Sequence, residues 1–300
     1  MSTSPVPPDA RVATGDSGVH YDTPPVVFER LLDRNMNYSS GYYLTGEESL
    51  DDAQTAKMDK IAAMCGFRPG DRVLDLGCGW SGPATYFADV HGCQVTGYTL
   101  SEVQRDFAMA RAEARGCADR LDIRVQNVLD AELEEGRYDH VVFLESIIHM
   151  WEKDQIFARC HAALKPSGML FVQESCYDRD SRTEEYRGDR GFGAVDEAFG
   201  GTTVMVSAGE MLKQMEEQGF SPVYLENISN HYKRTLAQWC ENLDLHGEEM
   251  KAAAPEFFPL LRRYLMLALA TYRMEQTQCF LLAAQKAPQG WIRRVPGPRP

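Results

Sequence analysis

The stretch Val73-Leu74-Asp75-Leu76-Gly77-Cys78-Gly79-Trp80-Ser81-Gly82 determines the fold class of this chain. A short apolar run ends in three glycines spaced G-x-G-x-x-G, and a helical pattern follows from Pro83 to His91. This order predicts a buried strand, a tight turn and the N-terminus of a helix. Glycines let the backbone approach a ligand closely, and the free amides at the start of a helix face that ligand. The stretch is therefore typical of a site for a nucleotide-like molecule.

The position of Asp75 narrows the class of molecule, because the glycine spacing alone also marks dinucleotide-binding dehydrogenases. A carboxylate two residues before Gly77 would repel a pyrophosphate and would suit a cationic, amino-acid-like group. The arrangement D-x-G-x-G resembles motif I of the S-adenosylmethionine (SAM) methyltransferases, whose ligand carries a sulfonium and an ammonium but no phosphate. We therefore expect SAM as the cofactor and S-adenosylhomocysteine (SAH) as its product.

Helix and strand patterns alternate along the chain from residue 49 to residue 173. Helical spacing is found at Ser49–Met64, after the N-cap candidate Ser101 with Gln104 completing a capping box, and at Asp154–Leu164. Strand patterns occupy Gln94–Thr99, Leu121–Val125, Tyr138–Leu144 and Met169–Gln173. The alternation predicts an α/β fold with a parallel sheet covered by helices on both faces. A further helix, a strand, two amphipathic helices and a final strand are expected at 209–219, 223–228, 231–251, 256–276 and 280–284.

We expect one domain, from residue 19 to residue 286, between a disordered lead (1–18) and a tail (287–300). Within the domain, the patterns predict an N-terminal cover, a cofactor-binding core, a lid, and cap helices with the final strands; these occupy 19–70, 71–176, 177–206 and 207–286. The lid is inferred from its irregular, charged and glycine-containing sequence, which is long for a plain loop.

Composition excludes several classes of partner. A formal net charge of −13 over 300 residues disfavours nucleic acid, which would be repelled. No apolar run approaches the ~20 residues of a membrane span, and residues 1–18 lack the apolar core of a signal peptide. The eight cysteines have no paired spacing, so we expect free thiols and no metal site. These features predict a cytoplasmic protein without integral membrane association; a homo-oligomer is left open.

Several further motifs resemble those of one family. They are His20-Tyr21-Asp22 with Phe28, Tyr38-Ser39-Ser40-Gly41-Tyr42-Tyr43, Gly97-Tyr98-Thr99-Leu100-Ser101 with Gln104, and His231-Tyr232-Lys233-Arg234-Thr235-Leu236 with Trp239. In this order they resemble the cyclopropane-fatty-acid synthase and mycolic acid methyltransferase family of SAM-dependent enzymes. The resemblance implies a Rossmann-like class I SAM methyltransferase fold with an N-terminal helical cover and a C-terminal cap with a lid insertion.

The resemblance also implies which residues hold the cofactor. The glycine loop would contact the methionine part of SAM, the segment at 38–39 would close over it, and residues after the second and third strands would reach the ribose and adenine. The cofactor-binding residues expected in this way are Tyr38, Ser39, Asp75, Gly77, Gly79, Thr99, Leu100, Gln104, Asn127, Val128 and Leu129.

Glu145 and His149 follow the fourth strand, at the carboxyl edge of the sheet where ligands bind in such folds. His149 is suited to accept a proton because the ordinary pKa of histidine lies near neutrality. Glu145 could orient the imidazole, contact the substrate or stabilise a transient cation. In the structural alternative, His149 caps a helix and Glu145 pairs with an arginine.

Cyclopropanating members of the family hold a bicarbonate, thought to act as the base, through a cysteine, a glutamate, a histidine and a tyrosine. The corresponding positions here read Ser40, Glu145, Gln173 and Tyr264, so two of the four differ. The resemblance therefore implies simple methyl transfer rather than cyclopropanation. We expect Glu145, His149, Tyr264 and Glu174 to be the catalytic residues, with His149 or a carboxylate such as Glu174 as the base.

The expected acceptor is an apolar small molecule. Aromatic residues are dense in the cover and cap, and ring faces stabilise carbocations and ammonium groups, although most of these rings should belong to the core. The lone histidines His20, His231 and His246 are expected to be structural. We expect C-methylation of an olefinic, prenyl or lipid-like molecule in specialised metabolism. The alternatives are N- or O-methylation of an alkaloid-like acceptor and a non-catalytic SAM-binding protein.

Overall fold

The computed structural model describes residues 23–182, 185–186 and 203–287. The expected N-terminal lead, most of the expected lid and nearly all of the expected tail lie outside these residues. His20 and Tyr21 also lie outside them.

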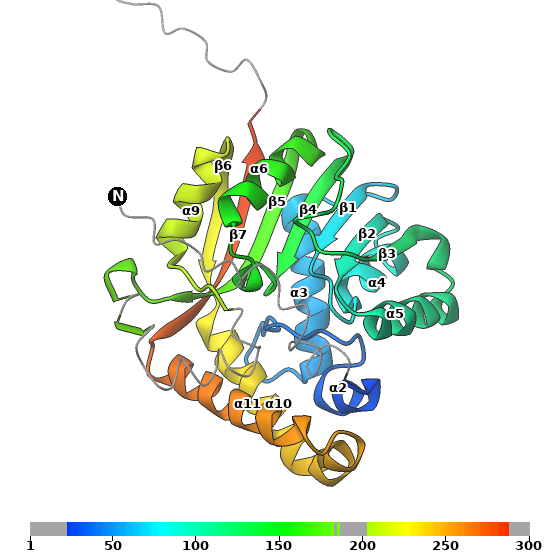
Figure 1. Ribbon diagram of the computed structural model, residues 1–300, viewed down its shortest axis with the longest axis vertical. Helices are drawn as coiled ribbons and strands as arrows, with labels where there is room; N and C mark the ends of the chain where they lie inside the picture. Colours follow the sequence, from blue (N-terminus) through cyan, green and yellow to red (C-terminus); the bar gives the residue numbers. More distant parts are fainter. Residues whose placement is uncertain (1–22, 183–184, 187–202, 288–300) are drawn as a thin grey trace, which may run out of the picture.

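Within the described residues, seven strands form one sheet in the order β3-β2-β1-β4-β5-β7-β6 (Figure 1). The strands are β1 (Arg72–Leu76), β2 (Gln94–Thr99), β3 (Leu121–Val125), β4 (Tyr138–Leu144), β5 (Leu164–Tyr177), β6 (Phe220–Asn227) and β7 (Thr277–Lys286). The five strands from β1 to β5 are parallel, as the alternating pattern predicts. The sheet as a whole is mixed, because β7 runs antiparallel to both of its neighbours, β5 and β6.

Strand β5 is longer than the prediction of Met169–Gln173. The expected break at 165–168 is included in it, with Ser167 at a φ of 64°. At its other end, antiparallel pairing with β7 continues from Gln173 to Tyr177, which pairs with Thr277. The sequence prediction was wrong here because a partner strand about 100 residues later supplies the hydrogen bonds. The extension brings Glu174 into the sheet.

Helices cover both faces of the sheet, as predicted. One hydrophobic cluster joins one face of the sheet to α2 (Pro25–Leu31), α3 (Leu50–Cys65), α4 (Gly82–Asp89), α5 (Glu102–Arg115), α10 (Ser229–Ala253) and α11 (Phe257–Arg273). A second cluster joins the other face to α6 (Lys153–Ala163) and α9 (Ala208–Glu217). Neighbouring strand residues alternate between the clusters: Val73 and Phe171 belong to the first, Leu74 and Val172 to the second. Both faces of the central strands are therefore buried.

The helices α10 and α11 form a pair beside the sheet (Figure 1), and α2 packs against α10. Because β7 begins at Thr277, a few residues after α11, and pairs there with the last residue of β5, the pair lies at the carboxyl edge of the parallel strands. This is the edge at which the glycine loop follows β1. In the part of the chain that the structure describes, no helix is long and apolar enough to cross a membrane.

Candidate active site

A cavity of about 810 Å³ opens at the carboxyl edge of the sheet. Its walls come from the loops after β1, β2, β3 and β4, the end of β5, the segment at 38–39 and helix α11. All the residues expected to bind the cofactor or to act in catalysis line this one cavity: Tyr38, Ser39, Asp75, Gly77, Gly79, Thr99, Leu100, Gln104, Asn127, Val128, Leu129, Glu145, His149, Glu174 and Tyr264. The structure thus brings them together, and their individual roles stay predictions.

The loop after β1 requires glycine at two positions for steric reasons. Gly77 has a φ of 80°, and a Cβ there would lie 2.6 Å from Cβ of Ser146. A Cβ on Gly82 would lie 2.1 Å from the carbonyl oxygen of Asn35, so this glycine lets the N-terminal cover approach α4. The amides of Gly77 and Cys78 both donate to the carbonyl of Tyr98, at 3.0 and 2.8 Å. The turn is therefore fixed by the neighbouring strand as well as by its own residues.

Asp75 is buried in the wall of the cavity with an exposed fraction of 1%. Its Oδ2 has no hydrogen-bond partner among the described residues. Burial raises the pKa of this carboxyl to about 7, opposed by the positive charge of Lys57. A buried acceptor without a donor is costly, so a ligand that brings an N–H or ammonium group would stabilise it. The tight glycine turn and this acidic oxygen fit the amino-acid part of SAM.

Lys57 on α3 supports the cavity wall from behind Ser39, a role that the sequence did not predict. Its side chain is buried at 1% exposure, and Nζ donates to Oγ of Ser39 at 2.8 Å. Burial lowers its pKa to about 8, opposed by the charges of Asp33, Glu145 and Asp75. A signal was available: positions 53, 57 and 61 lie on one helical face, and the lysine stands between Ala53 and Ile61. A lysine on an apolar face is expected to have a buried partner.

In the part of the cavity wall expected to face the adenosine, Thr99 Oγ1 donates to Oε1 of Gln104 at 2.6 Å. The predicted N-cap of α5 is confirmed, because Oγ of Ser101 accepts from the amide of Gln104 at 3.2 Å. The second half of the predicted capping box was wrong: the Gln104 side chain bonds to Thr99 at the end of β2. Asn127 makes a local turn after β3, its Oδ1 accepting from the amide of Leu129 at 3.0 Å.

Glu145 follows β4 directly and has a φ of 59°, a strained value for a residue with a side chain. Its Oε1 accepts from the backbone amide of Ser40 at 2.7 Å and from Nε2 of Gln173 at 2.8 Å. Burial raises the pKa of Glu145, opposed by the Ser40 amide, the Tyr232 hydroxyl and the Gln173 amide. The two positions that differ from the cyclopropanating pattern, 40 and 173, therefore both contact this carboxylate.

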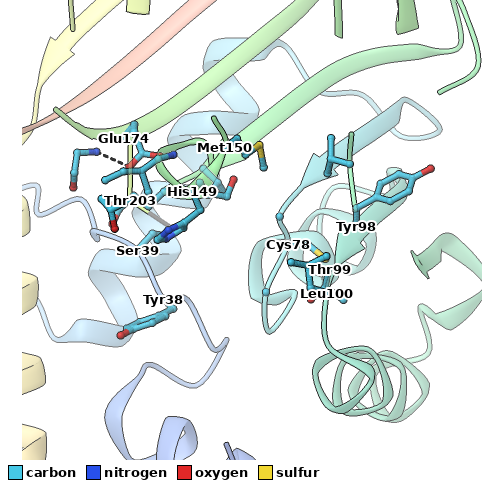
Figure 2. Close-up of a pocket in the computed structure, with 18 of the residues that line it drawn as sticks. Tyr38, Ser39, Cys78, Tyr98, Thr99, Leu100, His149, Met150, Glu174 and Thr203 are labelled. Carbon is cyan, nitrogen blue, oxygen red and sulfur yellow. Dashed lines mark hydrogen bonds between the residues drawn. The ribbon is translucent and has the colours of Figure 1, made fainter. Parts of the chain in front are cut away.

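The structural alternative for this pair was wrong. Within 23–182, 185–186 and 203–287, no ion pair joins Glu145 to an arginine. His149 ends a short 3-10 turn (Ile147–His149) and lines the cavity, and Glu152, not His149, is the N-cap residue of α6. Figure 2 shows His149, Glu174 and Ser39 on one side of the cavity in this view, and Cys78, Thr99 and Leu100 on the other.

Glu174 is the second buried carboxyl group at the site, with an exposed fraction of 1%. Its two oxygens accept from the backbone amides of Ile148 at 3.0 Å and Ser175 at 2.8 Å. Burial, together with the negative charge of Glu145, raises the pKa of Glu174 to about 8. A carboxyl group with a pKa near 8 can exchange a proton near neutral pH.

Tyrosines from the cap form the apolar side of the cavity. Tyr232 and Tyr272 pack edge to face with ring centroids 4.8 Å apart, and the Tyr272 hydroxyl lies 2.7 Å from Oγ of Ser175. Burial raises the pKa of Tyr264, so its hydroxyl stays protonated. Among the aromatic residues of the cover and cap, the cavity wall includes Tyr38, Tyr232, Tyr264 and Tyr272, while Tyr42, Tyr43 and Trp239 lie elsewhere.

Comparison with known proteins finds relatives that are similar in sequence over most of this chain. The chain is 27% identical over 250 residues to the "Probable fatty acid methyltransferase" of Pseudomonas putida, covering 83% of this chain and 63% of that protein. It is 28% identical over 273 residues to the "Sphingolipid C9-methyltransferase A" of Emericella nidulans, covering 89% of this chain and 52% of that protein. The chain thus spans between half and two thirds of the length of these curated relatives.

The fold is also that of a solved structure, the mycolic acid cyclopropane synthase CmaA1 complexed with SAH and CTAB. The TM-score is 0.82 at 20% identity, and the match covers 91% of this chain and 99% of that chain. The family model described as "Mycolic acid cyclopropane synthetase" matches residues 9–282, nearly the whole chain. The chain therefore belongs to the mycolic acid cyclopropane synthetase family of SAM-dependent methyltransferases.

Proposed function

We propose that this enzyme transfers a methyl group from SAM to a carbon atom of an olefinic, apolar small molecule. The observation that carries the proposal is a pair of carboxyl groups, the partly buried Glu145 and the buried Glu174, in the wall of a cavity that tyrosines line on the cap side. SAM, when bound, supplies an electrophilic methyl group. The residues of the chain must then hold the acceptor, stabilise positive charge on it and remove a proton.

Positive charge on the acceptor is the main demand of methyl transfer to an alkene. The π electrons form the new carbon–carbon bond, and the other carbon of the former double bond becomes cationic. Tyrosine faces and a carboxyl group in the cavity wall can stabilise such a cation. Glu145 suits this task, because the Ser40 amide, the Tyr232 hydroxyl, the Gln173 amide and the charge of Lys57 oppose the rise in its pKa that burial causes.

The cationic product must lose a proton to become a neutral alkene. Glu174 suits this step, because a carboxylate whose pKa is raised to about 8 is a stronger proton acceptor than an ordinary one. The proton leaves the carbon next to the cationic centre and goes to Glu174, and its electron pair forms the new double bond. His149, which also lines the cavity, is the competing base.

The names of two relatives also support an apolar, lipid-like acceptor. One is described as a probable fatty acid methyltransferase and another as a sphingolipid C9-methyltransferase, and both names refer to lipids. The cavity volume of about 810 Å³ lies in the upper part of the range of about 300–1,000 Å³ that small-molecule sites occupy.

The test is an incubation with methyl-labelled SAM and three acceptor sets: prenyl alcohols and diphosphates, unsaturated fatty acyl lipids, and aromatic amines. We expect label in a new C–CH₃ group of an olefinic acceptor, identified by mass spectrometry and ¹³C NMR. Label found only on nitrogen or oxygen would overturn the proposal in favour of heteroatom methylation.

Two variants assign the base. Glu174→Gln keeps the size of the side chain and should lower turnover at least about 100-fold, as general bases typically contribute 10²–10⁴-fold. His149→Gln should lower it far less. The reverse order would transfer the role of base to His149.

A further inference from the structure

Residues 38–43 form an irregular segment that connects the cofactor side of the cavity to Glu145. Tyr38 and Ser39 line the cavity, and the amide of the next residue, Ser40, donates to Oε1 of Glu145 at 2.7 Å. Segment 38–43 forms no helix or strand, so contacts from other elements must hold it in place.

On one side, α3 holds segment 38–43. The side chain of Gln54 donates to the carbonyl of Ser39 at 2.6 Å, and Lys57 donates to its hydroxyl at 2.8 Å. The amide of Tyr42 donates to the carbonyl of Ala53 at 2.9 Å. These contacts leave the amides of residues 41 and 43 to be satisfied from elsewhere.

On the other side, α10 supplies those partners. Nδ1 of His231 accepts from the amide of Tyr43 at 2.9 Å, and Oγ1 of Thr235 accepts from the amide of Gly41 at 3.0 Å. One turn further along, the ring of Trp239 packs on Tyr38 with centroids 5.3 Å apart. Thr235 and Trp239 are fully buried.

The spacing of these three side chains along α10 matches the spacing of their partners along the extended segment 38–43. Residues 231, 235 and 239 repeat every four residues and therefore form one stripe along α10. A helix rises about 1.5 Å per residue and an extended chain about 3.3 Å, so one turn of four helical residues spans about the same length as two extended residues. The step from His231 to Thr235 accordingly corresponds to the step from Tyr43 to Gly41.

We propose that His231, Thr235 and Trp239 are positioning residues that hold segment 38–43 in the conformation that binds the methyl donor and orients Glu145. This assigns a task to the sequence pattern H-Y-x-x-T-L-x-x-W, which the proposed chemistry does not use. The residue after His231, Tyr232, interacts with Glu145, so α10 reaches this carboxylate both directly and through segment 38–43.

The test measures SAH binding by titration calorimetry and thermal unfolding, neither of which requires the acceptor. Thr235→Val keeps the shape of the side chain and removes the acceptor, so we expect SAH affinity to fall about tenfold, and Thr235→Ser to restore it to within about twofold. The matched control is Thr55→Val: each threonine donates its hydroxyl to the carbonyl four residues earlier, at 2.8 Å in Thr55 and 3.0 Å in Thr235. Thr55 has no described contact with segment 38–43, so its replacement should leave SAH affinity unchanged.

A second variant removes the other acceptor. His231→Phe keeps a ring that can stack on Tyr42, as His231 does with centroids 4.4 Å apart, but cannot accept from the amide of Tyr43. We expect a several-fold loss of SAH affinity. Wild-type affinity in both Thr235→Val and His231→Phe would overturn the proposal. So would equal losses in Thr235→Val and Thr55→Val, or failure of Thr235→Ser to restore binding, since each indicates a general packing effect.

Discussion

The side-chain amide of Gln173 donates to Oε1 of Glu145 at 2.8 Å, and the same nitrogen lies 3.0 Å from the carbonyl oxygen of Ser40. One neutral donor thus joins the end of β5, the residue after β4 and segment 38–43. At this position the cyclopropanating pattern has a histidine, which can change its charge near neutral pH. A glutamine cannot, so in this enzyme the group that donates to Glu145 from this position stays neutral at every working pH.

Replacing Gln173 by leucine should lower turnover without a comparable loss of cofactor. A hydrogen bond to a charged group contributes about 1.5–3 kcal/mol, so we expect kcat to fall about 10- to 100-fold. SAH affinity should fall by less, because the lost bond to the Ser40 carbonyl is only one of several contacts that hold segment 38–43. Steady-state kinetics measures kcat, and titration calorimetry measures the SAH affinity. The matched control is Gln285→Leu in β7, whose amide donates to the carbonyl of Ser167 on the exterior. A loss of SAH affinity as large as the loss of kcat would contradict the assignment.

The rate should depend on pH through Glu174. Because burial and the charge of Glu145 raise its pKa to about 8, most Glu174 side chains are protonated at pH 7 and cannot accept a proton. We expect kcat to increase as pH rises from 6 to 9, with a midpoint near 8. The measurement is a pH profile of single-turnover rates with an olefinic acceptor. In Glu174→Gln the residual rate should show no step near 8, and a step that persists would assign the titration to another group.

The same group should make stability depend on pH in the opposite direction. The pKa of Glu174 is raised in the folded state, so its stabilising contribution is complete below the unfolded value of about 4.5 and is lost as pH rises towards 8. Over this window each pH unit costs up to ~1.4 kcal/mol. We expect the unfolding free energy of the wild type, measured by urea denaturation, to fall more steeply between pH 5 and 8 than that of Glu174→Gln. Parallel curves would show that Glu174 titrates normally in the folded state.

Substitutions of two glycines in the loop after β1 should have different effects on SAH binding and on stability. A Cβ on Gly79 meets no atom within 4 Å, although the φ of 51° costs about 1 kcal/mol for a residue with a side chain, so Gly79→Arg should fold with a modest loss of stability and abolish SAH binding by filling the cavity. A Cβ on Gly77 would lie 2.6 Å from Ser146, so Gly77→Ala should lower the melting temperature by several degrees as well. Circular dichroism measures the melting temperature of each variant, and titration calorimetry measures its SAH binding. Retained SAH binding in Gly79→Arg would place the methyl donor away from this loop.

The sequence predicted most of the fold because its signals were local. The limits of β2, β3 and β4 agree with the expected ranges to the residue, since each strand is short and lies between turn or helix signals. The length of β5 was not predictable in this way. Its extension depends on pairing with β7, and no short-range pattern carries that information.

Residues of the site were predictable where a sequence motif fixes their position. They were not predictable where burial in the fold determines a side chain's contacts or its pKa. Positions of Asp75 and Glu145 followed from the ends of strands, and both line the cavity. The involvement of Lys57 did not follow, because a lysine on a helix is usually exposed and only packing of α3 under Ser39 buries it. The raised pKa of Glu174 likewise results from strand pairing that removes it from water.

The position of β7 inside the sheet has a consequence for the order in which the protein can assemble during translation. Strand β6 emerges from the ribosome before β7, yet its place in the sheet is defined only by β7, which separates it from β5. Until residues 277–286 are synthesised, β6 has no partner and the end of β5 that carries Glu174 has a free edge. The cavity can therefore be completed only at the end of synthesis, because Thr277, the first residue of β7, belongs to its wall and β7 supplies the pairing that holds Glu174 in the sheet.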